Sequence, residues 1–130
     1  MLTTDQQVCL TRKDHDHIHW LIRNSRLLYP DDRVSADQLK KELKKSILFD
    51  DGELPPDVVR LGSTVTVKEL EKGQTMQFTI VTPDKSDLKN RRVSVLSPVG
   101  TALIGLSKGN MIRWRVPAGE KTFLIEEVIQ

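Results

Sequence analysis

Three histidines near the amino terminus are the first residues whose spacing is suited to chemistry. On a helix, His15 and His19 would share one face at a spacing that can bind a metal ion. His17 would point elsewhere, and no cysteine or zinc-protease motif accompanies the histidines. We therefore favour a polar stripe facing solvent or a partner over a metal site, and we predict no bound metal.

A second cluster of residues is basic. Lys89, Arg91 and Arg92 fall in a polar stretch, and Arg113 and Arg115 fall on the outward side of an expected strand. Such side chains can contact phosphates without reading base sequence. The chain shows no helix-turn-helix pattern, zinc motif or aromatic reader, so we predict at most a weak, non-specific nucleic-acid contact. The alternative for these residues is a solvated surface.

The sequence contains no set of residues typical of an independent enzyme. There is no Ser/His/Asp arrangement, phosphate-binding loop or glycine-rich dinucleotide motif. We therefore predict a protein that is not an enzyme, with no cofactor and no small-molecule substrate. The balance of 20 basic against 18 acidic side chains is close to neutral and indicates no particular partner.

The compartment follows from what the composition lacks. The single cysteine, Cys9, cannot close an intrachain disulfide, which is typical of a reducing environment. No apolar run approaches the roughly 18 residues of a membrane span, and the first ten residues do not resemble a signal peptide. We expect a cytoplasmic protein that does not bind membranes.

An acidic, proline-containing segment, residues 50–57, divides the chain into two parts. Before it, apolar residues at helical spacing predict one helix from Arg12 to Leu28 and a second from Ala36 to Leu48. The sequence between them, Tyr29 to Val34, predicts a turn. Two amphipathic helices joined in this way predict an antiparallel hairpin, which we assign to an N-terminal domain over residues 1–52.

Residues 53–130 form the second predicted domain. Apolar and polar residues alternate there, with turn sequences at 71–74, 108–110 and 117–120. Ser97 and Pro98 predict the start of a short helix. The order of elements predicts a strongly bent antiparallel sheet wrapped around that helix, so the fold class is α+β.

The second part resembles a known family. The segment Ser97-Pro-Val-Gly-Thr-Ala-Leu-Ile-Gly, followed by a strand and Pro117-Ala-Gly-Glu-Lys, is similar to the C-terminal domain of the bacterial Gre transcription factors, whose fold is similar to FKBP. Upstream, Leu54-Pro-Pro-Asp-Val-Val followed by Ser63-Thr-Val-Thr-Val resembles the related Rnk group. The first part of the chain resembles these proteins only in architecture.

The resemblance implies RNA polymerase as the partner. In the family, the FKBP-like domain docks at the rim of the secondary channel, and the helical hairpin points inward. The matching positions here are Ser97 and Pro98, with Leu96 directly before them. Gre factors tend to have an acidic residue at that preceding position, so we expect an apolar contact through Leu96 in place of a charged one.

Two acidic residues at the hairpin tip of Gre factors help to hold a catalytic magnesium ion, and this chain has Asp31 and Asp32 at the corresponding place. The predicted helices would be about 25 and about 20 Å long, which is shorter than the Gre hairpin. We therefore expect a polymerase-binding regulator that does not itself supply cleavage carboxylates. Two alternatives stay open: a true cleavage-stimulating elongation factor, and a non-catalytic interaction module with another partner.

Overall fold

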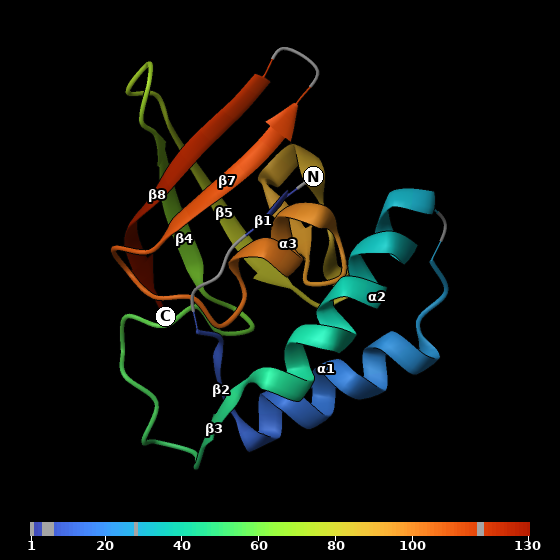
Figure 1. The fold of residues 1–130 in the computed structure, drawn as a ribbon. Coiled ribbons are helices and arrows are strands. Elements are labelled where there is room, and N and C mark those ends of the chain that lie inside the picture. The colour runs from blue at the N-terminus through green and yellow to red at the C-terminus, as the bar shows by residue number, and fades with distance from the viewer. Residues whose placement is uncertain (1, 4–6, 28, 117–118) are drawn as a thin grey trace.

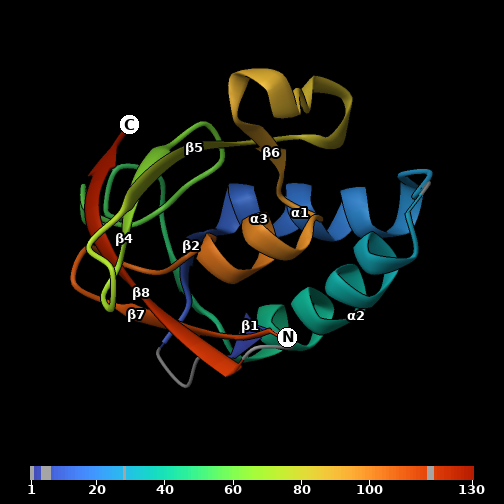
Figure 2. The ribbon, with the colours of Figure 1, turned by 90° about the horizontal axis from the view of Figure 1, so that it is seen from above.

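The computed structural model describes residues 2–3, 7–27, 29–116 and 119–130 and shows a mixed helix and sheet fold. Two long helices lie on one side of a curled sheet, and a short third helix lies between them and the strands (Figures 1 and 2). The helices are α1 (Arg12–Asn24), α2 (Pro30–Lys45) and α3 (Pro98–Leu103), with the short 3-10 turns η1 (Pro83–Lys85) and η2 (Leu88–Asn90). The strands are β1 (Leu2–Thr3), β2 (Cys9–Thr11), β3 (Ile47–Phe49), β4 (Thr64–Glu69), β5 (Thr75–Val81), β6 (Arg92–Ser94), β7 (Met111–Val116) and β8 (Gly119–Ile129).

Within the described residues, the main sheet has six strands in the order β1-β7-β8-β4-β5-β6. Its neighbours pair antiparallel, as predicted, except that β6 runs parallel to β5. The prediction of an all-antiparallel sheet is wrong at this edge, because the excursion through η1 and η2 returns the chain in the direction in which it left. Strand β1, which the sequence pattern did not indicate, adds to the other edge beside β7.

Helix α1 begins where the sequence predicts, because Thr11 caps it. The Thr11 hydroxyl accepts a hydrogen bond from the Asp14 backbone N–H at 3.0 Å. The helix ends at Asn24, before the predicted end, since Ser25 adopts an extended backbone conformation. The predicted last residue, Leu28, lies outside the described residues, as do residues 117–118 of the last predicted turn.

Helix α2 begins earlier and ends earlier than predicted. Pro30 occupies its first turn, so Asp31 and Asp32 lie in the helix and not in a turn. After Lys45 the chain becomes extended, and Ile47–Phe49 pairs in parallel with Cys9–Thr11. The helical spacing of Ile47 therefore misled the sequence prediction, because a strand partner from the amino terminus overrides it.

One buried cluster joins the two parts of the chain. It includes Ile18 from α1, Leu39 from α2, Leu103 from α3 and Val65 and Ile125 from the sheet. This core includes residues from both sides of residue 52. The division into two domains stays a prediction. None of the helices in the described ranges has the length and apolar character that a bilayer crossing needs.

Candidate functional site

The start of α3 is held by a serine that makes two hydrogen bonds. The Ser97 hydroxyl accepts from the Gly100 backbone N–H at 3.2 Å and donates to the Ser94 carbonyl at 2.6 Å. Pro98 follows at the first helical position, where a missing N–H costs nothing. Both side chains are half-buried, so they keep part of their surface accessible to a partner.

Two glycines, Gly100 within the first turn of α3 and Gly105 just after its end, allow the backbone of neighbouring segments to approach closely. A Cβ atom on Gly100 would lie 2.8 Å from the Cα atom of Val95, so any larger residue would push α3 away from the end of β6. Gly105 has a φ of +79°, and its carbonyl accepts a hydrogen bond from the Cys9 N–H at 2.9 Å. The spacing in the sequence motif thus reflects packing requirements at both ends of the helix.

Leu96 is buried in the structure, whereas the sequence predicts that its side chain contacts a partner. Its side chain is completely buried in the core, and its backbone N–H donates to the Ser94 hydroxyl at 3.0 Å. A fully buried side chain offers no surface to a partner, so an apolar contact through Leu96 is not available in this structure. Leu96 anchors the segment from which Ser97 and Pro98 are presented.

The acidic pair lies at the end of the helices distant from β2 and β3, as Figure 1 shows for the start of α2. Asp31 is exposed, and Asp32 is half-buried. Burial, together with the neighbouring charge of Asp31, raises the pKa of the Asp32 carboxyl. In the first turn of a helix both carboxylates interact favourably with the helix dipole, so they have a structural role whatever else they do.

Two exposed apolar residues flank the acidic pair. The side chains of Tyr29 and Val34 are 67% and 69% exposed. Sequence reasoning did not single them out, because an apolar residue in a predicted turn gives no sign of its exposure. Apolar surface of this kind beside two carboxylates is a candidate contact surface.

The histidines form a stack on α1. The rings of His15 and His19 have centroids 6.5 Å apart, and His15 Nδ1 lies 3.3 Å from the Asp16 carboxylate. In the described part of the chain, no group of three or more His, Cys, Asp or Glu side chains is arranged to hold a metal ion. The two rings can stack with one another, and the neighbouring carboxylate orients His15.

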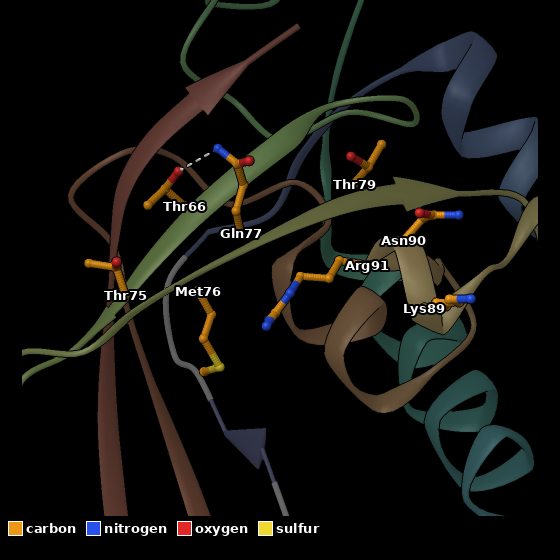
Figure 3. Close-up of a pocket in the computed structure, with 8 residues that line it drawn as sticks. All are labelled: Thr66, Thr75, Met76, Gln77, Thr79, Lys89, Asn90 and Arg91. Carbon is orange, nitrogen blue, oxygen red and sulfur yellow. Dashed lines mark hydrogen bonds between the residues drawn. The ribbon is translucent and has the colours of Figure 1, made fainter.

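The basic residues do not all gather in one place. Lys89, Arg91 and Arg92 are exposed. Lys89 and Arg91 lie in the connection between β5 and β6, where Arg91 has a left-handed φ of 56°, and Arg92 is the first residue of β6. Arg113 lies in β7, which β8 and β4 separate from β5, and the side chain of Arg115 lies outside the described residues. Lys89 and Arg91 border a groove beside β5 that Figure 3 shows in close-up.

The α3 motif, the curled sheet and the paired helices together define a class of transcription factor. Residues 54–130 match the family described as transcription elongation factor GreA/GreB, C-terminal domain. The chain belongs to this family.

Two relatives and two solved structures extend this result. The chain is 39% identical over 89 residues to the regulator of nucleoside diphosphate kinase from Escherichia coli K12, covering 68% of this chain and 65% of that protein. It is 38% identical over 88 residues to GreA from Clostridium beijerinckii, covering 68% of this chain and 55% of that protein. The matched region is therefore less than two thirds of either relative.

Structural similarity extends over almost the whole chain. A GreA/GreB elongation factor structure from Nitrosomonas europaea superimposes with a TM-score of 0.78 at 30% identity, covering 97% of this chain and 100% of that one. GreA factor homolog 1 from Thermus thermophilus has a TM-score of 0.51 at 18% identity over 96% of this chain and 100% of that one, which shows a shared fold alone.

Proposed function

We propose that the protein is a regulator of transcription that binds RNA polymerase and docks at its secondary channel without supplying cleavage carboxylates. The observation that carries this proposal is the hydrogen-bonded, partly exposed helix start at Ser97 and Pro98, within the region matched to the GreA/GreB family. The two hydrogen bonds of Ser97 and the buried Leu96 side chain order this segment before binding. Little conformational entropy of the segment would therefore be lost when a partner binds it. We also propose that the sheet with α3 is FKBP-like and that α1 and α2 form a helical hairpin.

The length of the helices supports the non-cleaving function. Helix α1 has 13 residues and α2 has 16, which correspond to about 20 and about 24 Å. Ala36 and Leu39 of α2 are buried in the common core. The buried part of α2 thus begins in its second turn, so at most its first six residues, about 9 Å of helix, can extend beyond the body of the protein. Asp31 and Asp32 are consequently held near that body.

The end of the helices supports a role in obstruction. Tyr29 and Val34 present apolar surface next to Asp31 and Asp32. In the proposed complex this end of the helices faces the secondary channel and hinders the entry of nucleotides. Docking through the start of α3 competes with other factors that bind the same rim of the polymerase.

Binding to core RNA polymerase tests the proposal directly. We expect saturable binding by the purified protein and a loss of affinity of about tenfold or more in Pro98→Glu, because a charge would be buried at the contact. Leu88→Ser is the matched control, since Leu88 is 78% exposed on a different surface loop. An absence of polymerase binding would favour the third hypothesis, an interaction module with another partner.

Transcript cleavage separates the two polymerase-binding alternatives. Added to a backtracked elongation complex, the protein should give no stimulated cleavage and should compete with a Gre factor for core polymerase. Strong stimulation that is lost in Asp31→Asn or Asp32→Asn would instead establish a cleavage factor.

A further inference from the structure

The edge of the main sheet at β5 is only half covered. Strand β6 pairs with β5 over Thr79–Val81, whereas β5 begins at Thr75. Within the described residues, the segment Thr75–Phe78 therefore has a strand partner on the β4 side alone. A stretch of sheet edge this long offers unpaired backbone groups to another chain.

The direction of these backbone groups follows from the neighbouring hydrogen bonds. The Thr79 N–H donates to the Arg91 carbonyl at 3.0 Å, on the side away from β4, and the Ile80 N–H donates to the Ser63 carbonyl at 3.0 Å, on the opposite side. Because successive residues of a strand alternate in this respect, Thr75 and Gln77 direct their N–H and C=O groups toward the open edge.

A groove of about 620 Å³ lies beside this edge (Figure 3). One wall consists of outward-facing residues of β4 and β5, among them Thr75 and Gln77, and the Gln77 side chain donates to the Thr66 hydroxyl at 3.3 Å. Lys89, Asn90 and Arg91 form the other wall. No carboxylate lines the groove among the described residues, so its fixed charge is positive.

We propose that this groove binds an extended acidic segment of a partner protein, which adds to β5 as a strand in line with β6. The main chain of the segment would pair with Thr75 and Gln77, and its acidic side chains would meet Lys89 and Arg91. The four residues of open edge span about 13 Å at the usual rise of a strand, enough for a four-residue pairing. This surface is separate from the start of α3, so the proposal does not depend on polymerase binding.

Charge argues against a second copy of the chain as the occupant. Pairing two β5 edges would bring the Lys89 and Arg91 side chains of both copies together, and like charges at a strand pair are destabilising. Cations beside an open edge are a common protection against self-association. The same cations attract an acidic strand.

Nucleic acid fits the groove less well than a peptide. Phosphates could pair with Lys89 and Arg91, but a nucleic-acid backbone lacks the alternating N–H and C=O groups that match Thr75 and Gln77. A bound peptide would therefore form hydrogen bonds with the backbone amides of Thr75 and Gln77, whereas a bound nucleic acid would leave them unpaired.

The test uses the whole chain and a short capped peptide of alternating valine and glutamate. We expect saturable binding, measured by fluorescence anisotropy, and slowing of amide hydrogen exchange at Thr75 and Gln77 by about tenfold or more. The same peptide methylated on alternate backbone nitrogens should not bind. Equal binding of the methylated peptide, or no protection at Thr75 and Gln77, would overturn the proposal. Binding of a single-stranded oligonucleotide in place of the peptide would do the same.

Two protein variants separate backbone pairing from charge. Gln77→Pro removes the N–H at the open edge without removing a bond to β4, and we expect at least about tenfold weaker binding. Gln77→Thr is the matched control, because it also loses the bond to Thr66 yet keeps the N–H. Lys89→Glu combined with Arg91→Asn should abolish binding, and asparagine is chosen because it tolerates the left-handed backbone of Arg91. Should Gln77→Pro not fold, the methylated peptide on the unaltered chain still decides the question.

Discussion

The guanidinium of Arg60 lies 3.6 Å from the Asp14 carboxylate, with Nε facing Oδ2. Arg60 follows the acidic segment that divides the chain, and Asp14 lies in the first turn of α1, so this contact joins the helical part to the part that carries the sheet. The Asp14 side chain is only 12% exposed, and its Oδ2 atom has no hydrogen-bond partner among the described residues. Arg60 is therefore the cation that offsets a buried charge.

Removing that cation should destabilise the fold. We expect Arg60→Met to lower the free energy of unfolding by about 1–3 kcal/mol, because the Asp14 carboxylate is left buried without a counter-charge. Urea unfolding measures the change. Arg12→Met is the matched control: its partner Asp50 is at a comparable distance, 3.1 Å, but both side chains are more than 60% exposed, so the loss should stay below about 1 kcal/mol.

A double-mutant cycle identifies the partner. Asp14→Asn removes the buried charge, so adding Arg60→Met to it should cost less than Arg60→Met costs in the parent protein. Strictly additive losses would show that Arg60 acts through packing or through Asp51, whose carboxylate also lies 3.6 Å from its guanidinium.

Packing at Gly100 gives a second prediction. In an ordinary helix, glycine to alanine is stabilising, yet Gly100→Ala places a methyl group 2.8 Å from the Val95 Cα atom. We expect it to lower the free energy of unfolding by about 1–3 kcal/mol or more, since the obstacle is backbone. Urea unfolding measures the change. A gain in stability, which an alanine with free space in a helix would give, would contradict the packing argument.

The sequence pattern predicts local structure well and tertiary pairing poorly. The start of α1 at Arg12 and the helix start at Ser97 and Pro98 are short-range features, and both lie where the pattern predicts them. The strand at Ile47–Phe49 depends on pairing with Cys9–Thr11, which helical spacing cannot reveal. The sequence likewise does not reveal that Leu96 is buried, because its burial depends on core residues distant in the chain and not on its position in the motif.

The loop that borders the groove gives a pH-dependent prediction. The Asn90 side chain donates a hydrogen bond to the Asp87 carboxylate at 2.7 Å, which lowers the pKa of Asp87 below its ordinary value of 3.8. A lowered pKa contributes stability that is present above the ordinary value and is lost as pH falls through the folded value. Asn90→Ala should raise the pKa of Asp87 toward 3.8 and weaken the pH dependence of stability below about pH 4.

Carboxyl titration by NMR measures the pKa of Asp87 in both proteins. Asp84 is the internal control, because a hydrogen bond from the Thr82 side chain is the main cause that lowers its pKa and Asn90 plays no part. An unchanged pKa of Asp87 in Asn90→Ala would mean that the backbone hydrogen bonds from Asn90 and Lys89 and the charge of Arg92, not the Asn90 side chain, stabilise the carboxylate.

The exposed end of the helices allows docking to be separated from obstruction. Tyr29→Ser combined with Val34→Ser should change stability by less than about 0.5 kcal/mol, because both side chains are largely exposed. Under the proposed function the double variant would still compete with a Gre factor for core polymerase, since competition depends on the start of α3. It would lose direct inhibition of nucleotide addition, which depends on apolar surface facing the channel. Parallel competition and single-nucleotide extension assays measure the two effects, and loss of both together would place the docking contact at the helix end and not at Ser97 and Pro98.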